Sequence, residues 1–265
     1  MSFNLLKGKR GIILGAFNES SIAWKIAEKA KEEGADFVLS NTAISIRLGT
    51  VKQLAEKLGT VVITADATKP EEIENLYKES MEIMDGKIDF ILHSIAMSPN
   101  VRKKLSYENL NYDYFQKTLD ISALSFHKML LVAKKFDVLN KWASVVALSY
   151  IASQRTLAGY NDMAEAKAML ESIARSFGYI YGKDKKVRIN TISQSPSETP
   201  ATSIIDGFDK YMNFSEKMSP LGNASAEDCA NACVLLFSDL SRKITMQNIC
   251  NDGGFSSMGV SYEVL

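Results

Sequence analysis

The sequence predicts an α/β fold: a single Rossmann-type, doubly wound domain with a seven-stranded parallel sheet flanked by helices. Two observations carry this prediction. Apolar segments that favour strands recur from the first residues almost to the last, and amphipathic segments with helical spacing separate them. This alternation is typical of parallel strands that are joined by crossover helices.

The predicted strands are short apolar runs bounded by polar or turn residues. In chain order they are Arg10–Leu14, Asp36–Ser40, Thr60–Ala65, Ile88–His93, Ala143–Ser149, Val187–Ile192 and Met246–Ile249. The strand at Ala143–Ser149 is apolar enough to be buried on both faces, as parallel strands are. The predicted helices lie near residues 20–33, 48–58, 70–84, 112–137, 160–182 and 225–238. The helix near 160–182 has a polar start followed by strong helix formers.

The chain has no internal repeat and no Gly/Ser/Pro linker, so we expect residues 1–265 to form one dinucleotide-binding and catalytic domain. The least regular stretch is Ser193–Thr202, a Ser/Pro-rich segment directly after a predicted strand. Loops at this edge of a sheet commonly carry function, which predicts a substrate-binding loop and short helix at about 194–218. An ordinary surface loop is the alternative.

The charge balance of the chain argues against several classes of partner. Lys+Arg and Asp+Glu both number 31, so there is no basic field to attract nucleic acid or an anionic membrane. No apolar run approaches membrane-spanning length, and no secretory signal opens the sequence. We therefore expect a cytoplasmic protein that binds neither nucleic acid nor a membrane.

Cysteine and histidine usage is sparse. Cys229, Cys233 and Cys250 form an odd, widely spaced set, which predicts reduced, buried, structural thiols. His93 and His127 are too far apart in sequence for a metal motif, so we expect no metal site.

Two phenols and an ammonium surround the point where the strand Ala143–Ser149 gives way to a helix. Tyr150 follows the strand, while Tyr160 and Lys167 are seven positions apart, which predicts that they share a face of the next helix. Open α/β sheets bind their ligands at the carboxyl ends of the strands. A tyrosine beside an ammonium is easier to ionise, so we predict Tyr150, Tyr160 and Lys167 as the catalytic residues of a hydride-transfer site.

A broken version of the dinucleotide-binding glycine fingerprint follows the first strand. Gly15 supplies the tight turn, and Ser20 and Ser21 are expected to cap the next helix so that its free amides face a pyrophosphate. Two later strand ends favour the same site. At Asp66–Ala67 a carboxylate would accept a hydrogen bond from an adenine, and at His93–Ala96 small residues let the backbone approach a ribose. Asp66 equally fits an ordinary helix-start residue.

The end of the second strand leaves the choice of coenzyme open. The acid that is typical of NAD sites is missing, and the run Leu39–Thr42 stands in its place. Arg47 would suit a 2′-phosphate, but it equally fits a solvated helix start. We expect NADH, with NADPH as the alternative.

Four features of the chain form a recognisable set: the pair Ser149-Tyr150, the Tyr160-to-Lys167 spacing, the run His93–Ala96 and the ending Asn251–Phe255. Together they resemble the enoyl-acyl carrier protein reductases of bacterial fatty acid synthesis, a divergent branch of the short-chain dehydrogenase/reductases. The resemblance runs from Gly8 to Phe255. Ordinary members of the superfamily carry lysine four positions after tyrosine and a catalytic asparagine upstream. Here those places hold Ala164 and Ser122, which again favours the enoyl branch.

The resemblance implies reduction of the trans-2 double bond of enoyl thioesters on acyl carrier protein by hydride from NADH. It implies that Tyr160 stabilises the enolate, that Lys167 holds the nicotinamide ribose and that Tyr150 lines the acyl pocket. Cofactor contacts are implied at Gly15, Ser21, Ile22, Asp66, Ala67, Ser94, Ile95, Ala96, Lys167 and Ser197. Substrate contacts are implied at Tyr150, Tyr160, Met163 and Phe208, although the last two equally suit core positions. Relatives are commonly homotetramers, so a homotetramer is expected.

Two other functions stay open at this point. An ordinary alcohol or ketone oxidoreductase is disfavoured by Ala164 and Ser122. A dinucleotide-binding regulator without catalysis is disfavoured because Tyr160 and Lys167 are both present.

Overall fold

A computed structural model of the chain describes residues 2–197 and 208–265. Seven strands form one parallel sheet in the order β3-β2-β1-β4-β5-β6-β7, which confirms the predicted Rossmann-type fold. The strands are β1 (Arg10–Leu14), β2 (Asp36–Asn41), β3 (Val62–Thr64), β4 (Ile88–His93), β5 (Leu139–Ser149), β6 (Arg188–Gln194) and β7 (Asn248–Asn251). The α-helices are α1 (Ile22–Glu32), α2 (Ala43–Leu48), α3 (Val51–Leu58), α4 (Pro70–Ile83), α5 (Pro99–Arg102), α6 (Tyr112–Leu119), α7 (Ser125–Lys135), α8 (Met163–Lys185), α9 (Phe208–Met218) and α10 (Ala226–Phe237).

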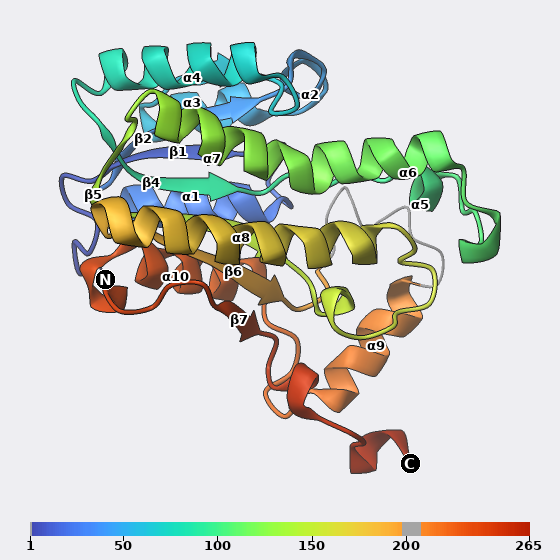
Figure 1. Cartoon of the computed structure of the whole chain (residues 1–265). Helices are drawn as coiled ribbons and strands as arrows, with labels where there is room; N and C mark the ends of the chain where they lie inside the picture. Colours follow the sequence, from blue (N-terminus) through green and yellow to red (C-terminus); the bar gives the residue numbers. More distant parts are fainter. Residues whose placement is uncertain (1, 198–207) are drawn as a thin grey trace.

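Helices cover both faces of the sheet (Figure 1). Apolar side chains of α4, α7 and α8 pack against one face, and those of α1, α3 and α10 pack against the other, so each face has its own buried cluster. The strand residues alternate between the two clusters, with Ile12 and Leu14 in one and Ile13 in the other. This double cover explains why the central strands are apolar throughout.

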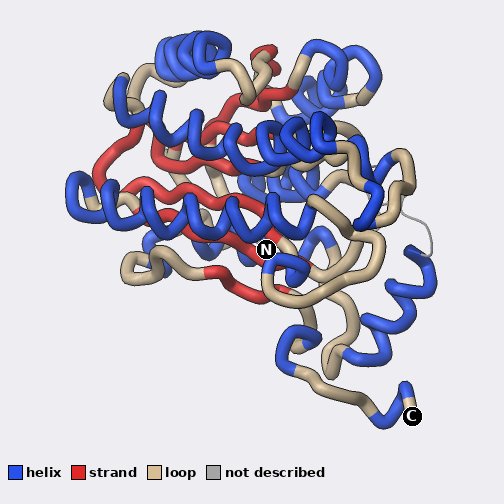
Figure 2. Tube along the Cα trace, turned by 45° about the vertical axis from the view of Figure 1, so that its right-hand side comes forward, coloured by secondary structure: helices blue, strands red, loops and turns tan. Residues whose placement is uncertain are grey.

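The carboxyl ends of the strands point toward α9, which lies beside the sheet instead of against either face (Figure 1). In Figure 2 the C-terminal residues also extend away from the sheet. Among the residues that the structure describes, no helix has the length and apolar character needed to cross a membrane.

The predicted helix at 112–137 is interrupted. A π-helical turn at Asp120–Leu124 separates α6 from α7. The hydroxyl of Ser125 donates to the Ile121 carbonyl oxygen at 2.6 Å inside this turn. Such a turn adds one residue to the helical repeat and commonly occurs at functional sites. Apolar periodicity alone does not reveal it.

Other predicted elements differ at their ends. The helix predicted at 48–58 is α3, which begins at Val51, and the short helix α2 precedes it without having been predicted. Gly49, which is extended with φ −97° and ψ −174°, separates the two helices. Strand β5 begins at Leu139, four residues before the predicted start, because the half-exposed residues Asn140 and Trp142 break the apolar pattern. Trp142 has a left-handed φ of 67° at the irregular start of this strand.

The three cysteines are free thiols, as predicted. Cys229 and Cys233 are buried in α10 under the sheet. Cys250 is exposed, so the prediction that all three are buried is wrong. The reason is that β7 is the edge strand, and only one of its sides is paired.

Candidate active site

A cavity of about 1000 Å³ lies at the carboxyl ends of the strands. It extends from the turn after β1 to the ends of β5 and β6 and to α9. Most of the residues predicted for the site line it, namely Gly15, Ser21, Ile22, Asp66, Ser94, Ile95, Ala96, Tyr150, Tyr160, Lys167, Ser197 and Phe208. The part of the predicted loop at 198–207 lies outside the described residues, and α9 (Phe208–Met218) falls within the predicted range of about 194–218.

Tyr150, Tyr160 and Lys167 meet in this cavity. The rings of Tyr150 and Tyr160 are in contact, with centroids 5.0 Å apart and planes inclined at 51°. Lys167 is buried in α8, and its Nζ donates to the carbonyl oxygen of Leu148 at 2.7 Å. This hydrogen bond ties the ammonium to the carboxyl end of β5, in the same cavity as the two phenols.

The route by which Tyr160 reaches the site differs from the prediction. Helix α8 begins at Met163, so Tyr160 precedes it and does not share a helical face with Lys167. Tyr160 stands in a turn in which Asn161 has a left-handed φ of 48°. The Nδ2 of Asn161 donates to the Leu105 carbonyl oxygen at 2.6 Å, which fixes this turn. Because Asn tolerates left-handed backbone better than most residues, it suits this position.

The pKa values of Tyr160 and Lys167 also differ from the prediction. Burial raises the pKa of Tyr160 above its usual value, and the nearby Tyr211 phenol adds to this effect. Burial lowers the pKa of Lys167 to about 8, and the Glu171 carboxylate opposes that shift. The expectation that the ammonium makes Tyr160 easier to ionise is therefore wrong, because desolvation outweighs it. Tyr160 is a neutral hydrogen-bond donor at neutral pH.

The turn after β1 requires glycine at position 15. Gly15 has a left-handed φ of 99°, and an added Cβ would lie 1.9 Å from the backbone oxygen of Ser94. The strands β1 and β4 therefore approach closely, since no side chain separates these two loops. Glycine at this position therefore lets the turn after β1 pack directly against the loop after β4, at the edge of the cavity.

The predicted serine cap of α1 is absent. Ser21 occupies the N-cap position, but its hydroxyl donates to the Asn18 carbonyl oxygen at 2.6 Å and accepts from the Phe17 amide. The amides of the first turn of α1 thus have no side-chain cap while Ser21 and Ile22 line the cavity. An uncapped helix amino terminus at this place suits a pyrophosphate.

Three predicted contact residues behave differently from the rest. Asp66 lines the cavity and also accepts hydrogen bonds from the amide and hydroxyl of Thr68, so both of its predicted roles are compatible. Ala67 packs in the core cluster beneath α4 and does not line the cavity. Met163 is likewise buried outside the lining, with its sulfur 3.7 Å from the Ser122 hydroxyl.

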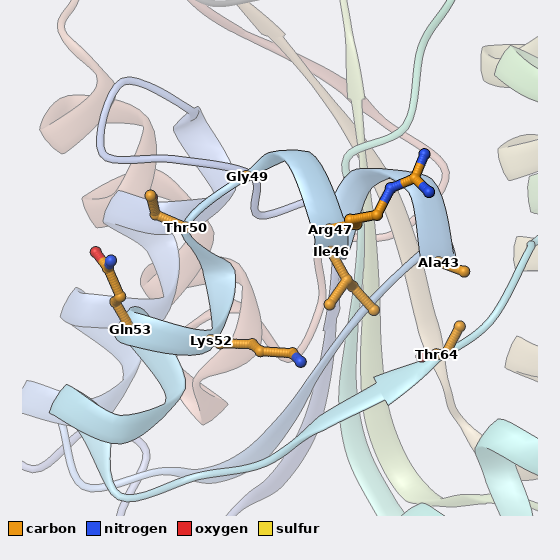
Figure 3. Close-up of a pocket in the computed structure, with 8 residues that line it drawn as sticks. All are labelled: Ala43, Ile46, Arg47, Gly49, Thr50, Lys52, Gln53 and Thr64. Carbon is orange, nitrogen blue, oxygen red and sulfur yellow. The ribbon is translucent and has the colours of Figure 1, made fainter.

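The end of β2 is neutral where it meets the cavity. Asn41, Thr42, Ile44 and Ser45 line this part, whereas Arg47 lines a separate hollow of about 500 Å³ between α2 and α3. In Figure 3 the Arg47 guanidinium ends well apart from the Lys52 ammonium, so the two cations do not converge on one point. The described residues at this end of the main cavity therefore offer no cation for a 2′-phosphate.

His93, at the end of β4, is fully buried behind the cavity. Its Nε2 lies 2.8 Å from the Ser125 hydroxyl, which itself donates to the Ile121 carbonyl oxygen, so Nε2 carries the hydrogen. Burial, together with the Lys167 charge, lowers the pKa of His93 to about 3. The imidazole is therefore neutral over the physiological pH range. No cluster of three or more metal-ligating side chains occurs among the described residues.

Ser122 holds the backbone on the far side of the cavity. Its hydroxyl accepts from the Met97 amide at 2.9 Å and lies 3.2 Å from the Met97 carbonyl oxygen. The π-helical turn carries this serine toward the loop after β4. Ser122 is fully buried, so its hydroxyl holds the Met97 backbone in place and does not reach a ligand in the cavity.

Sequence reasoning missed Asp162, a fully buried carboxylate next to Tyr160. It accepts hydrogen bonds from the Ser98 hydroxyl at 2.6 Å, the Asn100 Nδ2 at 2.7 Å and the Thr118 hydroxyl at 2.7 Å. One carboxylate thus joins the start of α8 to α5 and α6. Only its place two positions after Tyr160 hinted at a role, since its partners are distant in sequence.

Sequence reasoning also missed Tyr211, on α9. It lines the cavity, and its hydroxyl is close enough to raise the pKa of both Tyr150 and Tyr160, although burial is the main cause. Position 211 is three residues after Phe208 on one helix, so the two side chains share a face. That spacing is the sequence signal that could have pointed to Tyr211.

The fold and the cavity define a class: a Rossmann-type oxidoreductase of the short-chain dehydrogenase/reductase kind. A sequence profile described as enoyl-(acyl carrier protein) reductase matches residues 15–256. The chain belongs to this family.

Individual relatives agree with the profile. The NADH-dependent enoyl-[acyl-carrier-protein] reductase FabI of Rickettsia bellii is 36% identical over 98% of both chains, and that of Aquifex aeolicus is 34% identical over 97% of this chain and 94% of its own. A crystal structure of a FabI-NADH complex from Alistipes finegoldii is 65% identical, with a TM-score of 0.98 over 99% of this chain and 93% of that chain.

Proposed function

We propose that this protein reduces the trans-2 double bond of enoyl thioesters on acyl carrier protein, with NADH as hydride donor, in fatty acid elongation. The observation that carries this proposal is the convergence of Tyr150, Tyr160 and Lys167 in the cavity that begins at the turn after β1. Membership of the enoyl-(acyl carrier protein) reductase family supports it. We propose that the whole chain acts as one catalytic domain.

The residues present fit a nicotinamide dinucleotide. Gly15 allows close backbone approach, the uncapped start of α1 suits the pyrophosphate, and Asp66 offers a carboxylate at the end of β3. Ser94, Ile95, Ala96 and Ser197, which line the cavity, complete the proposed cofactor contacts, and Lys167 would donate to ribose hydroxyls. When bound, NADH supplies the hydride.

The side chains of this chain would act on the thioester as follows. Hydride addition at the β-carbon moves the electron pair of the double bond toward the thioester oxygen. The neutral Tyr160 phenol donates a hydrogen bond to that oxygen, which stabilises the enolate as its charge grows. Lys167 keeps the local field positive, and a proton from solvent then enters at the α-carbon. Tyr150, in ring contact with Tyr160, and Phe208 form apolar wall for the acyl chain.

Several features support the remaining parts of the proposal. The relatives from Rickettsia bellii and Aquifex aeolicus are named as NADH enzymes, which agrees with the neutral end of β2. We propose a homotetramer, which the exposed apolar side chains of Leu131, Tyr179 and Ile180 on α7 and α8 support. We also propose a cytoplasmic location.

A coupled set of rate measurements tests this function. The loss of NADH absorbance is followed with crotonyl and longer enoyl thioesters, with NADPH and with simple ketones as comparison substrates. We expect turnover of the enoyl thioesters with NADH. Failure with both coenzymes over several chain lengths, or preferential turnover of ketones, would contradict the proposal.

A further inference from the structure

Glu171 is a buried acid on α8 that the mechanism above does not use. Its side chain is 5% exposed and lies one helical turn beyond Lys167, so the two side chains share a face of the helix. Among residues 2–197 and 208–265, no Lys or Arg forms an ion pair with it at 4.0 Å or less. A buried acid without its own counter-ion is costly unless hydrogen bonds compensate for its lost hydration.

The carboxylate is fixed by the turn that carries Tyr150. Its Oε1 accepts from the hydroxyls of Ser149 at 2.6 Å and Ser153 at 2.5 Å, one on each side of Tyr150 in sequence. The Nε2 of Gln154 lies 3.5 Å from Oε2. Helix α8 is thereby tied to the end of β5 and to the short 3-10 helix η3 (Ile151–Ser153).

The Lys167 ammonium donates a hydrogen bond to the Leu148 carbonyl oxygen, directly before the same turn. Lys167 and Glu171 therefore hold one short stretch of backbone, residues 148–153, from two successive turns of α8. We propose that Glu171 is a positioning residue of the proposed reaction: it holds the Tyr150 turn in place and keeps the buried Lys167 ammonium charged.

The other titratable groups near Lys167 do not supply a negative charge that would keep it protonated. His93, at the end of β4, is neutral, because its pKa is about 3. Tyr150 and Tyr160 are protonated, since burial raises the pKa of both phenols. Asp66, a carboxylate that lines the cavity, follows the edge strand β3, whereas the Lys167 ammonium lies against β5. Burial lowers the pKa of Lys167 to about 8, and Glu171 is the group that opposes this.

The test is the pH dependence of kcat/KM for NADH, which reports groups of the free enzyme. In the wild type we expect this parameter to fall above pH about 8, as Lys167 loses its proton. Glu171→Gln keeps the size of the side chain and removes its charge. The alkaline limb should then move to lower pH by on the order of one unit, which is about a fivefold loss near pH 8, about a tenfold loss at pH 9 and above, and little loss at pH 6.

Two further variants make the result specific. Glu171→Asp restores the charge and should return the alkaline limb toward its wild-type position, even if the shorter side chain lowers the rate. Glu165→Gln is the matched control, because Glu165 is on the same helix but bonds to the Tyr107 hydroxyl, and it should leave the profile unchanged.

The inference rests on the proposed function, but its failure can be distinguished from a failure of that function. If Glu171→Gln loses activity equally at all pH values, or keeps the wild-type profile, the proposed role is overturned. If the wild type does not turn over enoyl thioesters, the function itself fails. In that case the pH dependence of NADH binding, measured by fluorescence titration of the same variants, still decides whether Glu171 sustains the Lys167 charge.

Discussion

At the scale of single residues, burial decides the chemistry of the site. The sequence shows a tyrosine and a lysine in proximity and suggests that the ammonium favours the phenolate. In the structure Lys167 is buried and its ammonium bonds to a backbone carbonyl oxygen, while Tyr160 is half-buried and desolvation of its phenol raises its pKa. A phenol that keeps its proton is suited to donate a hydrogen bond to a developing enolate.

Coenzyme choice is also a matter of single residues. Because no described residue at the β2 end of the cavity is a cation, we expect kcat/KM to be at least about tenfold higher with NADH than with NADPH. Ile44 lines this end and is 64% exposed, so Ile44→Arg should raise kcat/KM for NADPH about tenfold at little cost in stability. Ile44→Gln is the uncharged control. Equal use of both coenzymes by the wild type would contradict this assignment.

At the scale of elements, Asp162 joins the Tyr160 turn to α5 and α6. Asp162→Ala removes the acceptor that Ser98, Asn100 and Thr118 share, and the loss of these three buried hydrogen bonds should lower the free energy of unfolding by on the order of 3 kcal/mol. Thr118→Val removes one donor of the set and should cost about 1 kcal/mol. Urea unfolding midpoints measure both. An Asp162→Ala cost no larger than that of Thr118→Val would show that the carboxylate does not organise this network.

The sequence predicts elements well where apolar periodicity decides them. The strands at Arg10–Leu14 and Ile88–His93 are found with the predicted bounds, because their buried faces on both sides leave a continuous apolar run. The start of β5 was missed, since its first residues are half-exposed, and so was the π-helical turn at Asp120–Leu124. The hydrogen bonds that create such irregularities join residues far apart in sequence.

The residues of the candidate site also divide into those that the sequence predicts and those that it does not. Residues directly after strands, such as Gly15 and Tyr150, were predicted because a parallel sheet brings its carboxyl ends together. Tyr160 was placed in the cavity correctly, but on the basis of a helix that begins later. Asp162, Glu171 and Tyr211 escaped prediction, because their partners come from segments that only the folded chain brings together.

At the scale of the whole molecule, His93 should make the fold sensitive to acid. Its pKa is about 3 in the folded chain against the usual 6.5, so below pH 6.5 the unfolded chain takes up a proton that the folded chain refuses. This contribution to stability is complete above pH 6.5 and is lost as the pH falls toward 3. Between pH 6.5 and 5 the loss is about 2 kcal/mol.

Urea unfolding at several pH values measures this sensitivity. The variant His93→Gln keeps a hydrogen-bond donor for Ser125 and has no proton to gain, so its stability should depend less on pH over that interval. An identical pH dependence in the wild type and His93→Gln would assign the acid sensitivity to other groups.

The central claim is that a neutral Tyr160 phenol stabilises charge that develops on the thioester oxygen. Tyr160→Phe, assayed by NADH oxidation with an enoyl thioester and by NADH titration, tests it most directly. We predict that kcat falls roughly 10²- to 10³-fold, as when a single oxyanion donor is removed, while NADH affinity stays within about twofold of wild type. A variant that turns over as fast as wild type would contradict the claim.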